Sequence, residues 1–187
     1  MSFPVTIEAG QYQSSYIPTS GSSLSVTRSD EYAIDAGNSN VFSSTELSWF
    51  LDIEGFAEDG TIRYLTISDG GGFPYTNGYA VQYRSDGNLR IFRNGLDYAD
   101  AICIVNIDQA IRQKIAIRYK QNDMKVYING VSQSLNGSYV FQSMSGVDAM
   151  KATQPDSSTS NAFDGKIYEM KVWNEALSDS QLQALTS

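Results

Sequence analysis

The 187-residue chain contains no histidine, and this absence removes several functional classes at once. A Ser-His-Asp or Cys-His catalytic unit and any zinc site with an imidazole ligand both need that residue. Cysteine is almost absent too: Cys103 is alone, so no disulfide can form within the chain. Because Cys103 lies in the apolar run Ala101–Val105, we expect a buried core thiol rather than a reactive nucleophile.

Basic residues are also scarce, with 13 Lys and Arg against 21 Asp and Glu and a net charge of −8. Such a chain is poorly suited to the phosphate backbone of nucleic acids and to anionic lipid surfaces. No apolar run approaches the roughly 20 residues of a membrane-spanning helix, and Met1–Pro4 lacks the regions of a secretory signal. We therefore expect a soluble protein with no nucleic-acid partner and no membrane insertion.

What the sequence does contain is a series of tight-turn signals separated by short alternating segments. Asn-Gly and Asp-Gly pairs favour hairpins because these residues tolerate positive φ. Such pairs begin at Asp59, Asp69, Asn77, Asp86, Asn94, Asn129, Asn136 and Asp164. Between them, the segment 46–54 has one apolar face, made of Leu47, Trp49, Leu51 and Ile53. Many short strands of this kind are typical of an antiparallel sandwich or barrel.

The clearest hairpin joins 114–120 to 124–129 through a turn at Gln121–Asp123, and Asn129-Gly130 turns the chain again. Apolar and polar residues alternate along both segments, which indicates half-buried strands. Apart from a helix at the C-terminus, the sequence allows only a brief helix near Asp108–Gln113.

The C-terminal segment combines a strand and a helix. The strand alternates three apolar residues with charged ones, and we expect the three to share its buried face: Tyr168, Met170 and Val172. Ser178 and Gln181, three residues apart, form a capping box that predicts the start of a short helix. Leu182 and Leu185 give this helix an apolar side.

Three stretches resemble laminin-G-like modules of the concanavalin A-like superfamily: 46–55, 114–131 and 163–185. This resemblance implies that residues 30–187 form an all-β, two-sheet antiparallel jelly-roll sandwich with one short C-terminal helix. The same sandwich carries lectins, glycanases, adhesins and purely structural modules, so the fold alone does not assign a function.

A fourth stretch, 7–32, resembles a joint that recurs in bacteriophage virion proteins, such as tail fibres and other host-facing components. The likeness rests on Glu8-Ala9-Gly10, Ser15–Thr19 and Val26-Thr27-Arg28. It implies that residues 1–29 are an N-terminal arm packed on the sandwich. It also implies that the protein is part of a phage particle, as a module of a longer polypeptide.

Asp52 and Glu54 are the first candidate site. With Phe50 they occupy one face of a predicted strand, at the spacing of the Glu-x-Asp-x-Glu strand that catalyses hydrolysis in concanavalin A-like glycanases. The resemblance implies that Phe50 stands where those enzymes have their nucleophile, so one carboxylate of the pair is missing. We therefore expect sheet-face carboxylates, solvated or paired with Arg or Lys, and no enzyme; a glycan hydrolase is an alternative.

The loop 69–78 is the second candidate. Planar polar groups pair with sugar hydroxyls and aromatic rings pack on sugar C–H faces; Asp69 and Asn77 supply the first kind, Phe73 and Tyr75 the second. Glycines between them allow close approach of the backbone, and loops at sandwich edges commonly carry binding residues. The alternative is a loop whose aromatic side chains pack locally or at a subunit contact.

The third candidate follows the turn at Asn94-Gly95. Asp97 and Tyr98 are further candidates for glycan contact, and Asp97 with Asp100 would supply oxygen ligands to calcium. The resemblance implies such an ion, since laminin-G-like relatives often hold calcium at the sandwich rim. Calcium is the one cofactor that the sequence suggests; dispersed surface acids are the alternative.

The sequence thus favours a non-enzymatic carbohydrate-binding or adhesion module, a lectin of a phage virion protein that recognises a host-surface glycan. A structural or capsid-decorating virion subunit, which uses the sandwich for subunit contacts, is the alternative. The expected partners are host-surface glycan and other virion subunits, and the sequence also allows a homo-oligomer. The expected location is the virion.

Overall fold

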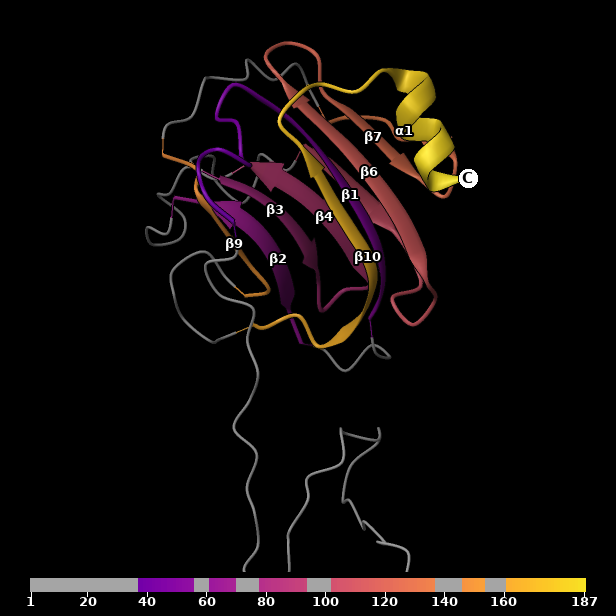
Figure 1. Cartoon of the computed structure of the whole chain (residues 1–187). Coiled ribbons are helices and arrows are strands. Elements are labelled where there is room, and N and C mark those ends of the chain that lie inside the picture. The colour runs from indigo at the N-terminus through magenta and orange to yellow at the C-terminus, as the bar shows by residue number, and fades with distance from the viewer. Residues whose placement is uncertain (1–36, 56–60, 70–77, 94–101, 137–145, 154–160) are drawn as a thin grey trace, which may run out of the picture. The chain divides into compact units, whose positions relative to one another are not determined.

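The computed structural model describes residues 37–55, 61–69, 78–93, 102–136, 146–153 and 161–187, drawn as coloured ribbons in Figure 1. All of them belong to one compact unit of the chain, Tyr32–Ser187. The predicted N-terminal arm, residues 1–29, lies outside the described residues.

The described strands form two five-stranded antiparallel sheets. Sheet I has the order β10-β1-β6-β7-β8, with bounds Gly165–Trp173, Glu46–Gly55, Gln113–Lys120, Lys125–Ile128 and Val131–Ser132. Sheet II has the order β5-β4-β3-β2-β9, with bounds Cys103–Asn106, Asn88–Arg93, Gly78–Tyr83, Arg63–Ser68 and Ala149–Lys151. The chain ends in α1, Asp179–Thr186. This arrangement confirms the predicted two-sheet sandwich with a short C-terminal helix.

The core lies between the two sheets because each strand turns alternate side chains inward. From β1 these are the four predicted apolar residues, all fully buried: Leu47, Trp49, Leu51 and Ile53. They share a cluster with Leu65, Ile67 and Val81 of sheet II. Cys103 belongs to the same cluster, and its burial, which disfavours the thiolate, raises its pKa to about 11. The expectation of a core thiol is confirmed.

The β6–β7 hairpin lies where the sequence predicts it. The register pairs Ile117 with Val126 across the two strands. In the turn between them Asn122 has a φ of 57°, and in the next turn Asn129 and Gly130 have φ values of 50° and 78°. Asn and Gly enter this left-handed region at the lowest cost, which is why they mark both turns in the sequence.

The brief helix that the sequence allows near residues 108–113 does not form, because the chain makes a turn there. The backbone N–H of Ile111 donates to the Asp108 carbonyl at 3.3 Å, and β6 already begins at Gln113. The Asp108 side chain accepts from the Ala110 N–H at 3.0 Å. This local side-chain bond offers the backbone an alternative to helical hydrogen bonds.

Helix α1 begins as the sequence predicts. The backbone N–H of Ser178 donates to the Gln181 side chain at 2.8 Å, and the Gln181 N–H donates to the Ser178 hydroxyl at 3.4 Å, which completes the capping box. The helix packs on the outer face of sheet I, where fully buried Leu182 shares a cluster with Phe50 and Tyr127. Across the described ranges, no helix has the length and apolarity needed to span a bilayer.

The expected burial of the C-terminal strand is right for Met170 and Val172, which pack against the core, and wrong for Tyr168. A register shift opposite Asp52/Ile53 leaves Tyr168 as an extra residue in β10, between partners of those two residues. A β-bulge of this kind re-aims one side chain. The Tyr168 side chain therefore lies on the outer face of sheet I and is 46% exposed.

Candidate functional site

The strands of sheet II bring two of the sequence-predicted sites to one end of the sandwich. Ser68, the last residue of β2, pairs with Gly78, the first residue of β3. At the same end, Tyr79 pairs with Arg93, the last residue of β4. The last residues of β2 and β4 therefore lie at the same end of the sheet, on either side of the start of β3.

The chain also enters β9 at this end. The backbone N–H of Asp148 donates to the Ser68 carbonyl at 3.1 Å, and a Cβ on Gly146 would lie 3.7 Å from the Cβ of Asp69. We call these strand ends, Ser68–Asp69, Gly78, Arg93 and 146–148, the loop end of sheet II.

Asp69 is the one predicted glycan contact that the structure describes, and it lies at this loop end, half-buried. The other predicted site residues lie outside the described residues: Phe73, Tyr75, Asn77, Asp97, Tyr98 and Asp100. In the sequence, the first three come between β2 and β3 and the last three between β4 and β5. Among the described residues, no three His, Cys, Asp or Glu side chains gather in a way that could hold a metal ion.

The outer face of sheet II continues from this end. Two cross-strand rows face away from the core: Arg90, Gln82 and Tyr64, and then Phe92, Ala80, Thr66 and Lys151. None of these residues was a candidate from the sequence. The sequence pattern that could have indicated them is the alternation in β4, where Arg90 and Phe92 alternate with the core residues Leu89 and Ile91.

Rings and planar polar groups on this face contact one another. The Gln82 side-chain amide donates to the Tyr64 hydroxyl at 2.6 Å. The Tyr64 and Phe92 rings meet edge to face, with centroids 6.2 Å apart, and the Arg90 guanidinium lies 6.0 Å from the Phe92 centroid. These four side chains are at most 6% exposed, so their contacts are packing contacts.

Two cations stand among the outward-facing strand positions of sheet II, Arg90 and Lys151. Both are at most 6% exposed, and both have interaction partners within the chain. Their charges are therefore engaged inside the protein.

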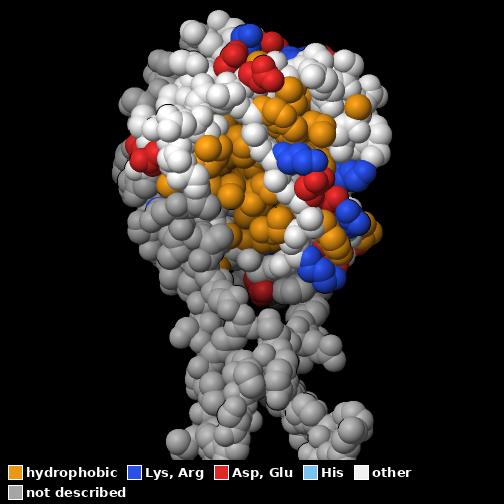
Figure 2. Space-filling view, in the orientation of Figure 1, with side chains coloured by type: hydrophobic (Ala, Val, Ile, Leu, Met, Phe, Trp, Pro, Cys, Tyr) orange, Lys and Arg blue, Asp and Glu red, His pale blue; other side chains and the backbone are white. Residues whose placement is uncertain are grey.

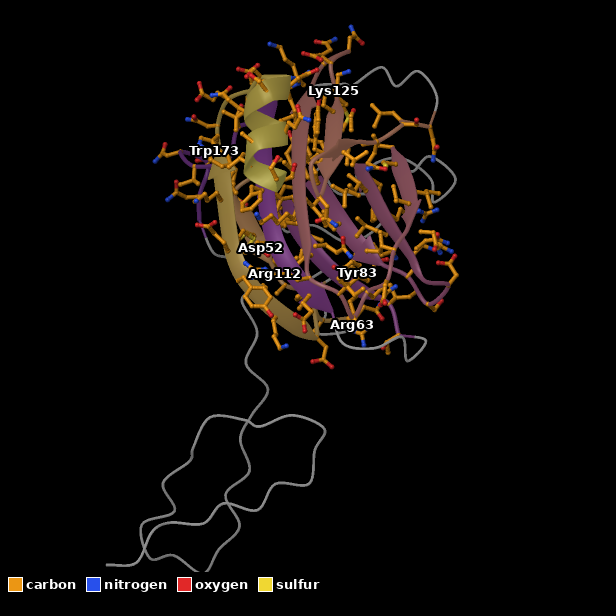
Figure 3. The ribbon with its side chains drawn as sticks, turned by 90° about the vertical axis from the view of Figure 1, so that its right-hand side faces the viewer. Asp52, Arg63, Tyr83, Arg112, Lys125 and Trp173 are labelled. Carbon is orange, nitrogen blue, oxygen red and sulfur yellow. The ribbon has the colours of Figure 1, made fainter. Side chains whose placement is uncertain are left out.

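The carboxylates of β1 lie on the outer face of sheet I, and each is paired with a basic side chain. Asp52 accepts from Arg112 Nε at 2.6 Å and from its Nη2 at 2.5 Å, and the two side chains are labelled in Figure 3. Glu54 accepts from Lys166 Nζ at 2.6 Å and from the Tyr168 hydroxyl at 2.7 Å. These carboxylates are paired with Arg and Lys, as expected.

The same contacts decide the protonation of the two carboxyls. The Arg112 hydrogen bond holds the pKa of Asp52 below its usual value, and the Lys166 hydrogen bond does the same for the pKa of Glu54. A general acid for glycoside hydrolysis needs a raised pKa. Phe50 packs under α1 and supplies no third carboxyl. This strand therefore does not present the carboxyl pair of a glycanase.

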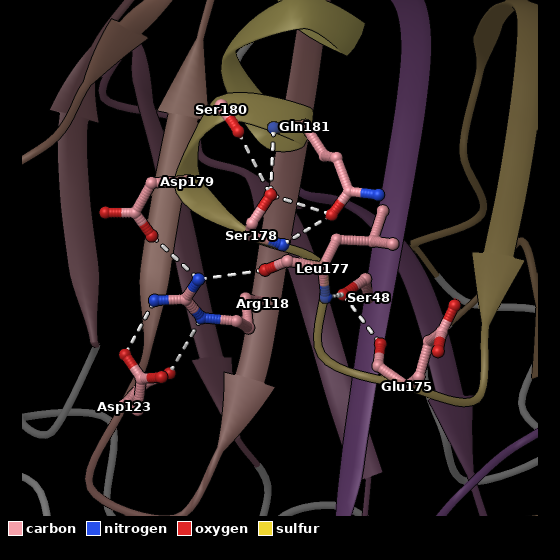
Figure 4. A network of polar contacts seen from close by, with 9 residues as sticks. All are labelled: Ser48, Arg118, Asp123, Glu175, Leu177, Ser178, Asp179, Ser180 and Gln181. Atoms are coloured by element: carbon pink, nitrogen blue, oxygen red, sulfur yellow. Dashed lines mark hydrogen bonds and ion pairs between the residues drawn. The ribbon is translucent and has the colours of Figure 1, made fainter.

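Arg118 fastens the C-terminal segment to the outer face of sheet I (Figure 4). Its Nη1 donates to the Leu177 carbonyl at 2.8 Å and to Asp179 at 2.7 Å, and its Nη2 donates to Asp123 at 2.6 Å. The Ser48 hydroxyl adds a second tie, since it accepts from the Leu177 N–H at 2.8 Å. Helix α1 and these bonds give this face a structural role.

The sequence and the fold were compared with known proteins. The sequence model of the family described as "Concanavalin A-like lectin/glucanases superfamily" matches residues 49–183. No curated protein matches the chain in sequence. The Ruminococcus gnavus IT-sialidase CBM40 bound to α2,3-sialyllactose has a TM-score of 0.63 and 16% identity, covering 83% of this chain and 94% of that one.

Parts of larger enzymes are similar as well. The leech intramolecular trans-sialidase complexed with 2,7-anhydro-Neu5Ac gives a TM-score of 0.60 at 16% identity over 82% of this chain and 26% of that one. The NanB sialidase from Streptococcus pneumoniae gives 0.54 at 17% identity over 78% and 25%. At these identities the structural likeness establishes the fold.

Proposed function

Since the chain belongs to the concanavalin A-like lectin/glucanase superfamily, we propose that it is a non-enzymatic carbohydrate-binding module whose site is the loop end of sheet II. The observation that carries this proposal is that β2 and β4 both end at the loop end, where half-buried Asp69 lies. Asp69 and the predicted contacts after β2 and β4 would pair with sugar hydroxyls and stack on sugar rings. Several copies would strengthen a binding that is weak at each site.

The ligand we propose is a glycan that bears a carboxylate. The support for this ligand class is the likeness in fold to a carbohydrate-binding module. The sialyllactose named for the Ruminococcus gnavus CBM40 is a sugar of this class, which makes it a suitable first ligand. Calcium at Asp97 and Asp100 is a further proposal, tested by adding and chelating the ion.

The proposed biological setting is a phage virion, in which the module would bind a host-surface glycan. Its support is the likeness of residues 7–32 to joints of tail-fibre and other host-facing proteins. A structural or capsid-decorating subunit is the competing role in the same setting. Baseplate and tail genes around the coding sequence favour adhesion, and capsid genes favour decoration.

Titration of the purified protein with α2,3-sialyllactose and with lactose tests the binding proposal. We expect saturable binding of sialyllactose and binding of lactose weaker by about tenfold or more, equivalent to about 1.4 kcal/mol. Asp69→Asn should weaken sialyllactose binding, whereas Asp86→Asn, which alters an exposed carboxylate at the opposite end of sheet II, should not. Absence of binding to these sugars and to an array of bacterial polysaccharides, with and without calcium, would sink the proposal.

A glycan hydrolase is tested separately. Release of reducing sugar that disappears in Glu54→Gln would show that β1 acts catalytically in spite of its ion pairs. We expect no release by the wild type, because the pKa values of both carboxyls are lowered.

A further inference from the structure

Strand β10 forms one edge of sheet I. It pairs with β1 on one side, and no described residue pairs with its other side. The strand is nine residues long and five of its residues are exposed, including Ile167 at 41%. A long edge strand presents a row of backbone donors and acceptors to any strand that can lie beside it.

The same edge exposes apolar side chains. Ile167, Met170 and Val172 face the interior but are only partly covered, and Met150 of β9 is partly covered at the edge of sheet II. β9 and β10 are end strands of the two sheets and both flank this side of the sandwich in Figure 1. Figure 2 shows apolar side chains gathered here beside a row of charged ones. We call this side the open edge.

We propose that a second copy of this chain covers the open edge, with β10 of one copy antiparallel to β10 of the other around a twofold axis at Met170. This inference goes beyond glycan binding and does not rest on it. A twofold axis perpendicular to the sheet keeps core-facing side chains on the core side. Residues opposite each other in an antiparallel pair share a face, so one residue must lie opposite its own copy, with the axis between the two. We name the axis by that residue.

The charges along β10 determine which residue lies at the twofold axis. An axis at Glu169 would place that carboxylate opposite its own copy, and an axis at Lys171 would oppose two ammonium groups. An axis at Met170 places Lys171 opposite Glu169 on both sides, and like charges directly opposite are destabilising while unlike charges stabilise. It also brings the two Met170 side chains together on the core side.

The ion pair within one chain can be replaced by ion pairs between the two copies. Within one chain Lys171 Nζ lies 2.7 Å from Glu169 Oε1, with both side chains about half exposed, and an ion pair of that kind contributes little to folding. The bulge at Tyr168 limits the regular ladder to a short stretch around Met170. A short ladder closed by apolar contacts makes a small interface, so we expect a dimer that dissociates on dilution.

Sedimentation of the full chain over a concentration series tests the proposal. At the highest concentration the mass should approach twice the 20.6 kDa of one chain. Lys171→Glu should weaken dimerisation by about tenfold or more, because two carboxylates would face each other across each half of the ladder. The double variant Glu169→Lys/Lys171→Glu restores the unlike pairs and should restore the dimer.

Lys120→Glu is the matched control, since Lys120 forms an exposed pair with Glu46 on the same sheet away from the open edge. It should leave dimerisation unchanged. Thermal unfolding of each variant shows that the fold is kept. A wild-type chain that stays monomeric, or a Lys171→Glu variant that dimerises as well as the wild type, overturns the proposal. Failure of the double variant to recover overturns the register at Met170.

Discussion

The outer faces of the two sheets have the same pleated geometry and are completed differently. On sheet I, α1 covers Phe50 and Tyr127, and the charged side chains beside it form ion pairs with one another. On sheet II, the rows that contain Tyr64 and Phe92 are at most 6% exposed and their side chains contact one another. The strands of sheet II end where half-buried Asp69 lies, and this is the end at which we propose glycan binding. The comparison sets a face closed by the C-terminal helix against a proposed binding end.

Of the changes considered, Arg118→Ala should lower the free energy of unfolding most, because it detaches the C-terminal segment from sheet I. The guanidinium is nearly buried, and its loss leaves Asp123, Asp179 and the Leu177 carbonyl without their donor. Removing one partner of a buried ion pair costs about 3–5 kcal/mol, and we expect the lower half of that range because both aspartates are about half exposed. Urea unfolding measures the loss.

The matched control is Arg84→Ala, which removes an exposed pair with Asp86 inside a turn and should cost less than about 1 kcal/mol. Equal losses for the two arginines would show that Arg118 does not hold the C-terminal segment.

Leu182→Ala should follow with a loss of about 2–4 kcal/mol, because a fully buried side chain leaves a cavity between α1 and sheet I. Leu185→Ala, at a partly covered position of the same helix, should cost less. Sialyllactose affinity of the folded Leu182→Ala protein should match the wild type. A large fall in affinity without unfolding would contradict the separation of the helix-covered face from the binding end.

Phe92→Leu tests the outer face of sheet II. It removes the ring that meets Tyr64 edge to face but keeps an apolar side chain, so we expect a stability loss of about 1 kcal/mol. Because Phe92 lies beside the loop end, glycan affinity should fall by several-fold in the same titration. Full affinity with reduced stability would assign this ring to packing alone.

The smallest effect concerns acid stability. The folded pKa values of Asp52 and Glu54 lie below their usual 3.8 and 4.5, because Arg112 and Lys166 favour the ionised forms. Groups with depressed pKa values stabilise the fold at neutral pH, and this contribution is lost as the pH falls below their usual values and through the lower folded ones. Asp52→Asn should therefore reduce stability at neutral pH and flatten its decline on acidification.

Unfolding midpoints measured from neutral to acidic pH provide the check. An unchanged decline in the Asp52→Asn variant would mean that other carboxyls control acid unfolding.

The sequence predicted those features that depend on local chemistry. The alternation in 46–54, the turns at Asn122 and Asn129, and the capping box at Ser178 are each set by a few neighbouring residues, and the structure confirms them. Tyr168 was misplaced because its bulge depends on the pairing of β10 with β1, which periodicity does not reveal.

The candidate site shows the same division. Loop composition alone identified Asp69, but its neighbourhood with β4 and β9 comes from the strand register. Arg90, Gln82 and Tyr64 lie on three strands, and only the sheet brings them into one row. The pairing of Asp52 with Arg112, sixty residues apart, likewise needed the fold before their role could be assigned.

Mapping amide chemical-shift changes during titration with α2,3-sialyllactose tests the central claim most directly. The account predicts saturable changes in Ser68, Gly78, Phe92 and their neighbours at the loop end of sheet II, with α1 unaffected. Changes confined to α1 and β10, or no saturable change at any amide, would contradict it.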